Sequence, residues 1–193
     1  MTQLTRRFDE ALLYARHVHG GQLRKGSSIP YFAHLLGAAA IAIEFGANED
    51  QAIAALLHDA VEDQGGQPRL DDIELRFGED VARMVKACTD TDVQPKPDWR
   101  PRKEAYLEHL ETAAPMDALL VSLSDKIHNA EAILSDLRAI GDEVWTRFTG
   151  RKDGTLWYYQ GLDKIFSQRL PGPAAVRLKF AVAELGRTAG KAQ

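Results

Sequence analysis

With 193 residues, 45% of them hydrophobic and 27% charged, the chain has the length and composition of one folded domain and not of a disordered segment. Its net charge of −4 argues against a nucleic-acid backbone as the main partner, but it is compatible with a local basic pocket for a small phosphorylated ligand. The single Cys88 excludes an intrachain disulfide and a multi-cysteine zinc site.

Apolar residues recur with helical spacing along nearly the whole chain, and no stretch of four or more residues alternates as a strand would. Gly20 and Gly21 are expected to stop the first helix, and Asn48 with Gln51 forms a capping pair before the third. Asp71 or Asp72 is expected to cap a short helix that ends at Gly78. In chain order, the predicted helices cover residues 8–18, 30–46, 49–64, 72–77, 81–88, 102–113, 115–139, 154–168 and 173–188.

These patterns predict an all-α helical bundle in which residues 1–193 form a single domain. Three prolines mark residues 93–101 as a loop. No charged-then-apolar leader opens the sequence, and no apolar run approaches the ~20 residues that span a bilayer. We therefore expect a cytoplasmic protein without membrane contact; the oligomeric state is not predicted.

Four ionisable residues interrupt residues 54–63, a stretch that otherwise has the apolar character of a buried helix. Burying His58, Asp59, Glu62 and Asp63 costs free energy unless these groups are paired. In a continuous helix, His58 lies one turn from Glu62 and Asp59 one turn from Asp63, so we predict that the four share one sector. A metal ion bound by His58 and Asp59 would offset the cost, with the other two carboxylates beside its water.

Further polar residues lie on apolar faces of two other predicted helices. Asp125 and Asn129 are spaced i, i+4 and so face the same neighbour. Taken alone, Asp125 is most simply an ion-paired structural residue, and His34 a hydrogen-bonded core histidine. Together with His58 and Asp59, however, they complete a set of two imidazoles and two carboxylates.

This ordered set resembles the H…HD…D motif of the HD-domain metal-dependent phosphohydrolase superfamily. More narrowly, the chain resembles the small alarmone hydrolases, single-domain relatives of the hydrolase half of the RelA/SpoT proteins. The resemblance implies an all-helical fold that binds one divalent ion and removes the 3′-pyrophosphate of guanosine tetra- or pentaphosphate. It rests on residues 15–19, 22–25, 30–34, 54–63, 77–78, 89–90 and 124–129.

The resemblance also implies the metal ligands. They would be His34, His58, Asp59 and Asp125, and the family usually binds Mn²⁺. Imidazole and carboxylate donors without thiolate are equally compatible with Fe²⁺ or Zn²⁺.

Other matched residues correspond to the family's catalytic and substrate-binding positions. Glu62 and Asp63 match its catalytic acidic pair, of which Glu62 is the better candidate to orient or deprotonate the attacking water. Arg24 and Lys25 match a basic pair that contacts the nucleotide and its phosphates. Asn129 matches an asparagine near the sugar or the reacting phosphate, with a helix-packing hydrogen bond as the alternative.

The substrate is less defined than the reaction class. A guanosine 3′-pyrophosphate is the first choice, with ppApp, the 2′-phosphate of NADPH, a deoxynucleotide or a non-catalytic role as nucleotide sensor as alternatives. The basic loop that contains Arg100, Arg102 and Lys103 is a candidate phosphate contact, although a surface loop is the simpler interpretation. The aromatic residues in 145–148 and 156–159 are candidates for base or ribose contacts, with core packing as the simpler interpretation.

Overall fold

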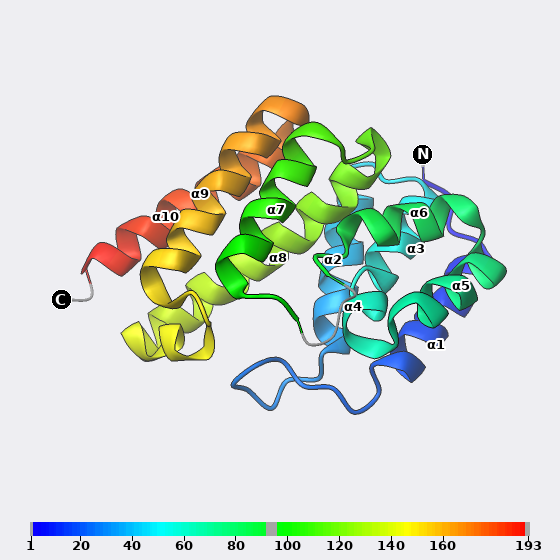
Figure 1. Ribbon diagram of the computed structural model, residues 1–193, viewed down its shortest axis with the longest axis horizontal. Helices are drawn as coiled ribbons and strands as arrows, with labels where there is room; N and C mark the ends of the chain where they lie inside the picture. Colours follow the sequence, from blue (N-terminus) through cyan, green and yellow to red (C-terminus); the bar gives the residue numbers. More distant parts are fainter. Residues whose placement is uncertain (1, 92–95, 192–193) are drawn as a thin grey trace.

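Helices dominate the computed structural model, which describes residues 2–91 and 96–191 (Figure 1). In these two ranges, the only β-type pairing is an isolated bridge between Leu23 and Pro30. The elements are α1 (Arg6–Val18), α2 (Phe32–Glu44), α3 (Glu49–Leu57), α4 (Ala60–Gln64), α5 (Gly66–Phe77), α6 (Glu79–Cys88), α7 (Trp99–Thr112), α8 (Met116–Ile140), the 3₁₀ helix η1 (Gly141–Arg147), α9 (Arg151–Arg169) and α10 (Pro173–Lys191). The all-α prediction is confirmed.

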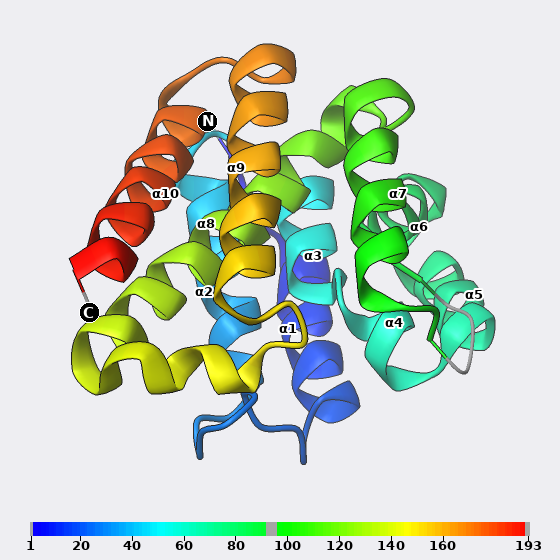
Figure 2. The same ribbon diagram turned by 60° about the vertical axis from the view of Figure 1, so that its left-hand side comes forward.

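The long helix α8 lies between an N-terminal and a C-terminal group of helices (Figures 1 and 2), and it contributes to the hydrophobic core of each group. The N-terminal core is built by α1 to α6, with Ala118 and Val121 of α8. The C-terminal core is built by α7 to α10 and η1, with Ile41 of α2. Because α8 packs against α2, α3, α6 and α10, polar side chains on these helices can meet inside the protein.

Several predicted boundaries are confirmed closely. The Asn48 side chain accepts a hydrogen bond from the Gln51 N–H, and the Gln51 side chain accepts one from the Asn48 N–H, both at 2.9 Å. Helix α8 differs from its predicted range by one residue at each end. Within the described ranges, no helix combines the length and the apolar character needed to cross a membrane.

Other boundaries differ for identifiable reasons. The predicted cap at Asp71 or Asp72 is wrong, because α5 already begins at Gly66, after Gly65 reverses the chain with φ 140°. Helix α7 begins at Trp99 and not at residue 102, since a proline is tolerated in the first helical turn, where its missing N–H is not needed. Of the predicted loop 93–101, residues 93–95 lie outside the described ranges.

Candidate metal centre and substrate cavity

The predicted continuous helix across residues 54–63 is wrong, because His58 and Asp59 form a turn between α3 and α4. The Nδ1 atom of His58 donates a hydrogen bond of 2.8 Å to the Ala55 carbonyl oxygen. In a continuous helix that oxygen would accept the N–H of Asp59. The His58 ring thus competes with the helical pattern at this point, whereas the predicted one-turn spacing of Asp59 and Asp63 is kept by a hydrogen bond of 3.0 Å from the Asp63 N–H to the Asp59 carbonyl oxygen.

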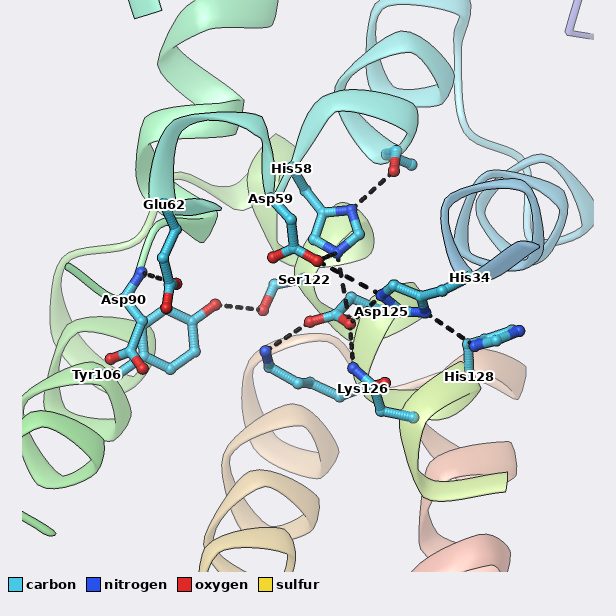
Figure 3. A network of polar contacts seen from close by, with 12 residues as sticks. His34, His58, Asp59, Glu62, Asp90, Tyr106, Ser122, Asp125, Lys126 and His128 are labelled. Atoms are coloured by element: carbon cyan, nitrogen blue, oxygen red, sulfur yellow. Dashed lines mark hydrogen bonds and ion pairs between the residues drawn. The ribbon is translucent and has the colours of Figure 1, made fainter. Parts of the chain in front are cut away.

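His34, His58, Asp59 and Asp125 nevertheless converge between α2, the α3–α4 turn and α8 (Figure 3). The His58 Nε2 atom lies 2.9 Å from Asp59 Oδ2 and 3.5 Å from Asp125 Oδ1. The His34 Nε2 atom lies 3.6 Å and 3.2 Å from the same two oxygens. Ligand atoms of His34, His58 and Asp59 all lie within 4.8 Å of one another. The structure therefore brings together all four residues predicted as ligands.

The donor atoms of this cluster fit a divalent cation. The Nε2 atoms of His34 and His58 are buried, and neither has a hydrogen-bond partner among the described residues. Because the Nδ1 atom of His58 donates to a carbonyl, the neutral ring presents the lone pair of Nε2 to the carboxylates. Lone pairs and carboxylates directed at one point repel each other unless a positive charge lies between them. Mixed imidazole and carboxylate donors suit Mn²⁺, Fe²⁺ and Zn²⁺.

Without a bound ion, a proton on His58 and the ammonium group of Lys126 balance the negative charges of Asp59 and Asp125. Burial opposes the charged imidazole, but Asp59 and Asp125 outweigh it and raise the pKa of His58 well above its ordinary value. Burial likewise opposes an ionised Asp125, yet Lys126 and His58 hold the pKa of Asp125 well below its ordinary value. The Lys126 Nζ atom lies 2.5 Å from Asp125 Oδ2. The pKa of Asp59 is lowered as well, so the carboxylates of Asp59 and Asp125 both remain ionised at neutral pH.

Cation affinity is expected to rise with pH. A cation needs the neutral imidazole of His58 and must displace its proton, and the raised pKa places this competition above the ordinary value of about 6.5. We expect the affinity for Mn²⁺ to increase by up to about tenfold per pH unit below that pKa. Calorimetric titrations between about pH 6 and pH 8 measure this dependence. A constant affinity over the range would contradict His58 as a ligand.

Residues behind the cluster hold the ligands in place and were not predicted. The Tyr31 hydroxyl donates to Asp59 Oδ2 at 2.5 Å, and the Nδ1 atoms of His128 and His34 lie 2.9 Å apart. Gly37 leaves room for His128, because a Cβ at this position would lie 2.1 Å from its ring. Such outer partners fix the orientation and tautomer of a ligating histidine. The i, i+3 spacing of His128 from Asp125 is the sequence signal that could have identified it.

A cavity of about 480 Å³, within the usual range of small-molecule sites, adjoins the cluster. Lys126 and Asn129 line it, and both also contact the Asp125 carboxylate. A wall rich in cations favours a phosphorylated ligand. The cationic residues on this wall are Arg24, Lys25, Arg102, Lys103, Lys126 and Arg147.

The predicted acidic pair is divided between two environments. Glu62 lines the cavity, where its carboxylate accepts a hydrogen bond from the Asp90 N–H at 3.3 Å (Figure 3). It also accepts one from Lys96 Nζ at 2.8 Å. The Asp63 carboxylate instead accepts from Gln22 Nε2 at 2.8 Å and lies 3.5 Å from Lys96 Nζ. Of the two, Glu62 is the carboxylate on the wall of the cavity.

The three predicted substrate contacts lie on the same cavity wall. Arg24 Nη1 donates to Asn129 Oδ1 at 2.9 Å, and Asn129 Nδ2 donates to Asp125 Oδ1 at 2.5 Å. Asn129 thus links Arg24 on the cavity wall to Asp125 in the cluster of histidines and aspartates. Lys25 is exposed and also lines the cavity.

The basic loop and α7 contribute selectively to the cavity. Arg102 and Lys103 line it, and both contact the Asp90 carboxylate. The Arg100 guanidinium instead stacks on Trp157, 3.3 Å from the ring centroid. The sequence interpretation of a plain surface loop is therefore wrong for two of the three basic candidates.

Parts of the two aromatic runs also reach the cavity. Phe148, Tyr158 and Tyr159 line it, whereas Trp145 is buried in the C-terminal core. The sequence analysis missed Lys126, which lies in an apolar helix beside Asp125 and carries no spacing signal of its own. It also missed Asp136, a helix residue with the pattern of an ordinary surface carboxylate.

Comparisons with known proteins agree with this geometry. The model of the HD domain family matches residues 11–156. The chain is 39% identical over 140 residues to the guanosine-3′,5′-bis(diphosphate) 3′-pyrophosphohydrolase MESH1 of Xenopus tropicalis, covering 71% of this chain and 73% of that protein. It is 32% identical over 133 residues to the bifunctional (p)ppGpp synthase/hydrolase SpoT of Escherichia coli, covering 66% of this chain but only 18% of SpoT.

A solved structure extends the similarity beyond the matched sequence. The structure of a metazoan ortholog of SpoT that hydrolyses ppGpp superposes with a TM-score of 0.74 and 27% identity, covering 98% of this chain and 99% of that one. The family model covers more than half of the chain and spans the clustered histidines and aspartates, so this protein belongs to the HD domain family.

Proposed function

We propose that the protein removes the 3′-pyrophosphate from guanosine 3′,5′-bis(diphosphate), yielding GDP and pyrophosphate, and from the pentaphosphate, yielding GTP. The observation that carries this proposal is the convergence of two buried imidazole nitrogens and two carboxylates beside a cation-lined cavity. The names of the homologous hydrolases, which act on ppGpp, supply the substrate.

In this proposal His34, His58, Asp59 and Asp125 hold one divalent ion, with Mn²⁺ as the first choice by family resemblance. Bound there, the ion supplies Lewis-acid chemistry, lowering the pKa of a water and polarising a phosphoryl oxygen. Tyr31 and His128 keep the ligands oriented through their hydrogen bonds to Asp59 and His34.

Glu62 is proposed as the residue that orients the attacking water and accepts its proton. The water oxygen forms a bond to the phosphorus next to the ribose 3′-oxygen, and the bond between that phosphorus and the 3′-oxygen breaks. The proton that Glu62 accepted from the water is then passed to the 3′-oxygen, which restores the Glu62 carboxylate. Lys96 and the Asp90 N–H hold the Glu62 carboxylate on the cavity wall. Asp63, which also contacts Lys96, supports the position of that lysine.

The basic residues of the cavity are proposed to bind the phosphates. Arg24 can pair bidentately with a phosphate or stack on a base, and its contact with Asn129 places it near the cluster. Lys25, Arg102 and Lys103 supply further positive charge around the leaving group and the 5′-phosphates. Arg102 Nη1 also lies 3.7 Å from Glu62 Oε1, so proton transfer and charge neutralisation are proposed to take place side by side on this wall.

We propose that residues 1–193 form one HD domain, which acts in the cytoplasm on a small phosphorylated nucleotide. The packing of α10 along α8 supports the inclusion of the C-terminal helices in this domain. Neither a nucleic acid nor a membrane is required for the proposed reaction.

A substrate panel tests the proposed function. Purified protein with Mn²⁺ is incubated with ppGpp, pppGpp, ppApp, NADPH and a deoxynucleotide, and the products are resolved as pyrophosphate or orthophosphate. We expect pyrophosphate from the guanosine substrates, and its loss after a chelator and recovery after Mn²⁺ is restored. Orthophosphate release from NADPH or deoxynucleotides, or nucleotide binding without turnover, would favour one of the alternative functions instead.

A further inference from the structure

The cavity extends along α8 away from the metal cluster. Asn129, Ala132, Ile133 and Asp136 all line it, and their spacing places them on one face of the helix. From Asp125 to Asp136 the helix rises by roughly 16 Å, at 1.5 Å per residue. A nucleoside whose 3′-phosphoryl group lies at the cluster can bridge this length, so its base would face the end of the cavity near Asp136.

An ion pair occupies that end of the cavity. Arg147 Nη1 donates to Asp136 Oδ2 at 2.7 Å, and both residues line the cavity. The Asp136 side chain is 47% exposed and the Arg147 side chain 21% exposed, so a ligand can reach them. A half-exposed pair contributes little to stability, which leaves room for a role in recognition.

Gly26 fixes where the Arg147 side chain lies. Its φ is +70°, a conformation that residues other than glycine rarely adopt. A Cβ at this position would lie 2.6 Å from the Arg147 Cδ atom, so the arginine stem rests directly on the loop backbone. The same loop carries Arg24 and Lys25, and the loop and the ion pair therefore form one continuous wall.

We propose that Asp136 and Arg147 read the base and select guanine over adenine; this inference rests on the proposed function for the placement of the 3′-phosphate. Guanine presents two N–H donors, at N1 and N2, next to the O6 acceptor. A carboxylate accepts both donors, and a guanidinium beside it donates to O6. Adenine would place the N1 lone pair against the carboxylate and an amino group against the guanidinium, so both contacts are lost.

The test compares ppGpp and ppApp in wild type, Asp136→Asn and Arg147→Lys. Wild type is expected to prefer ppGpp, by kcat/KM, at least about tenfold, since a mismatched polar edge leaves unpaired groups in the site. The amide introduced by Asp136→Asn has only one acceptor oxygen for the two donors, and a lysine lacks the planar fork of arginine. Both substitutions are therefore expected to bring the ratio close to one.

A matched control is Glu131→Gln. Glu131 lies on the same helix and pairs with Arg177 at 2.7 Å, but it lies outside the cavity lining. Its substitution is expected to leave the ratio of the two nucleotides unchanged. If the loss of any ion pair on α8 changed the ratio of kcat/KM for ppGpp and ppApp, Glu131→Gln would change it too. If the effect is specific to Asp136, Glu131→Gln leaves the ratio as in wild type.

Binding separates this inference from the proposed function. The two nucleotides are titrated into metal-free protein, where the base preference can be read without turnover. Wild type that releases no pyrophosphate contradicts the proposed reaction. If it nevertheless binds ppGpp more tightly than ppApp, and Asp136→Asn removes that difference, the proposed contact between Asp136 and guanine is supported. If wild type has no base preference, or if Asp136→Asn keeps it, the guanine contact is overturned, whatever the turnover.

Discussion

Asp59→Ala is expected to abolish both cation binding and hydrolysis. The Asp59 carboxylate lies 2.9 Å from His58 Nε2 and 3.6 Å from His34 Nε2, so it faces both imidazoles, as the Asp125 carboxylate does. Loss of an outer-shell partner alone weakens metal sites by about 10- to 100-fold, so the loss of a ligand should cost at least about 100-fold in Mn²⁺ affinity. Calorimetric titration and pyrophosphate release measure the two effects.

The control for Asp59→Ala is Asp71→Ala in α5. The Asp71 carboxylate accepts a hydrogen bond from Gln67 on the exposed side of that helix. This variant should bind Mn²⁺ as wild type does, and circular dichroism should show both variants folded. Affinity within about twofold of wild type in a folded Asp59→Ala protein would remove Asp59 from the ligand set.

The Glu62→Gln variant is expected to bind the cation as wild type does but to lose most of its hydrolytic activity. The amide preserves the size of the side chain and can still accept the hydrogen bond from the Asp90 N–H, but it cannot take a proton from water. General base catalysis contributes about 10²- to 10⁴-fold, so kcat should fall by that factor, with a smaller change in KM. Single-turnover hydrolysis and Mn²⁺ titration separate the two properties.

Asp63→Asn provides the comparison within the acidic pair. Asp63 contacts Gln22 and Lys96, whereas Glu62 lies on the cavity wall, so we expect Asp63→Asn to reduce kcat less than Glu62→Gln does. A larger loss in Asp63→Asn would exchange the two roles. Wild-type turnover in Glu62→Gln with metal bound would exclude Glu62 as the base.

The sequence contains enough information for the helices and for the residues of the metal cluster. Helical periodicity depends on neighbours within a few residues, and the Asp125–Asn129 spacing correctly predicted a shared face, since the two side chains form a hydrogen bond. The family resemblance added the order of the histidines and aspartates, and the structure brings the predicted ligands together.

What the sequence could not predict depends on contacts between distant segments or on local competition. The turn at His58 arises because a side chain takes a carbonyl that the backbone would otherwise use. His128 reaches His34 only because Gly37 on α2 leaves space for its ring. Arg147 rests on Gly26, and no pattern within a helix relates these two positions.

Helix α8 runs without interruption from Met116 to Ile140, so residue count alone sets how far apart its ends lie and which way each side chain points. Adding or removing one residue between Asn129 and Asp136 would turn everything beyond it by about 100° around the axis. Asp136 would then leave the cavity wall, while Asp125 would stay in register with its histidines. The number of residues in this part of the helix is therefore constrained in addition to their identity, because it sets both the distance and the relative orientation of the two ends of the cavity.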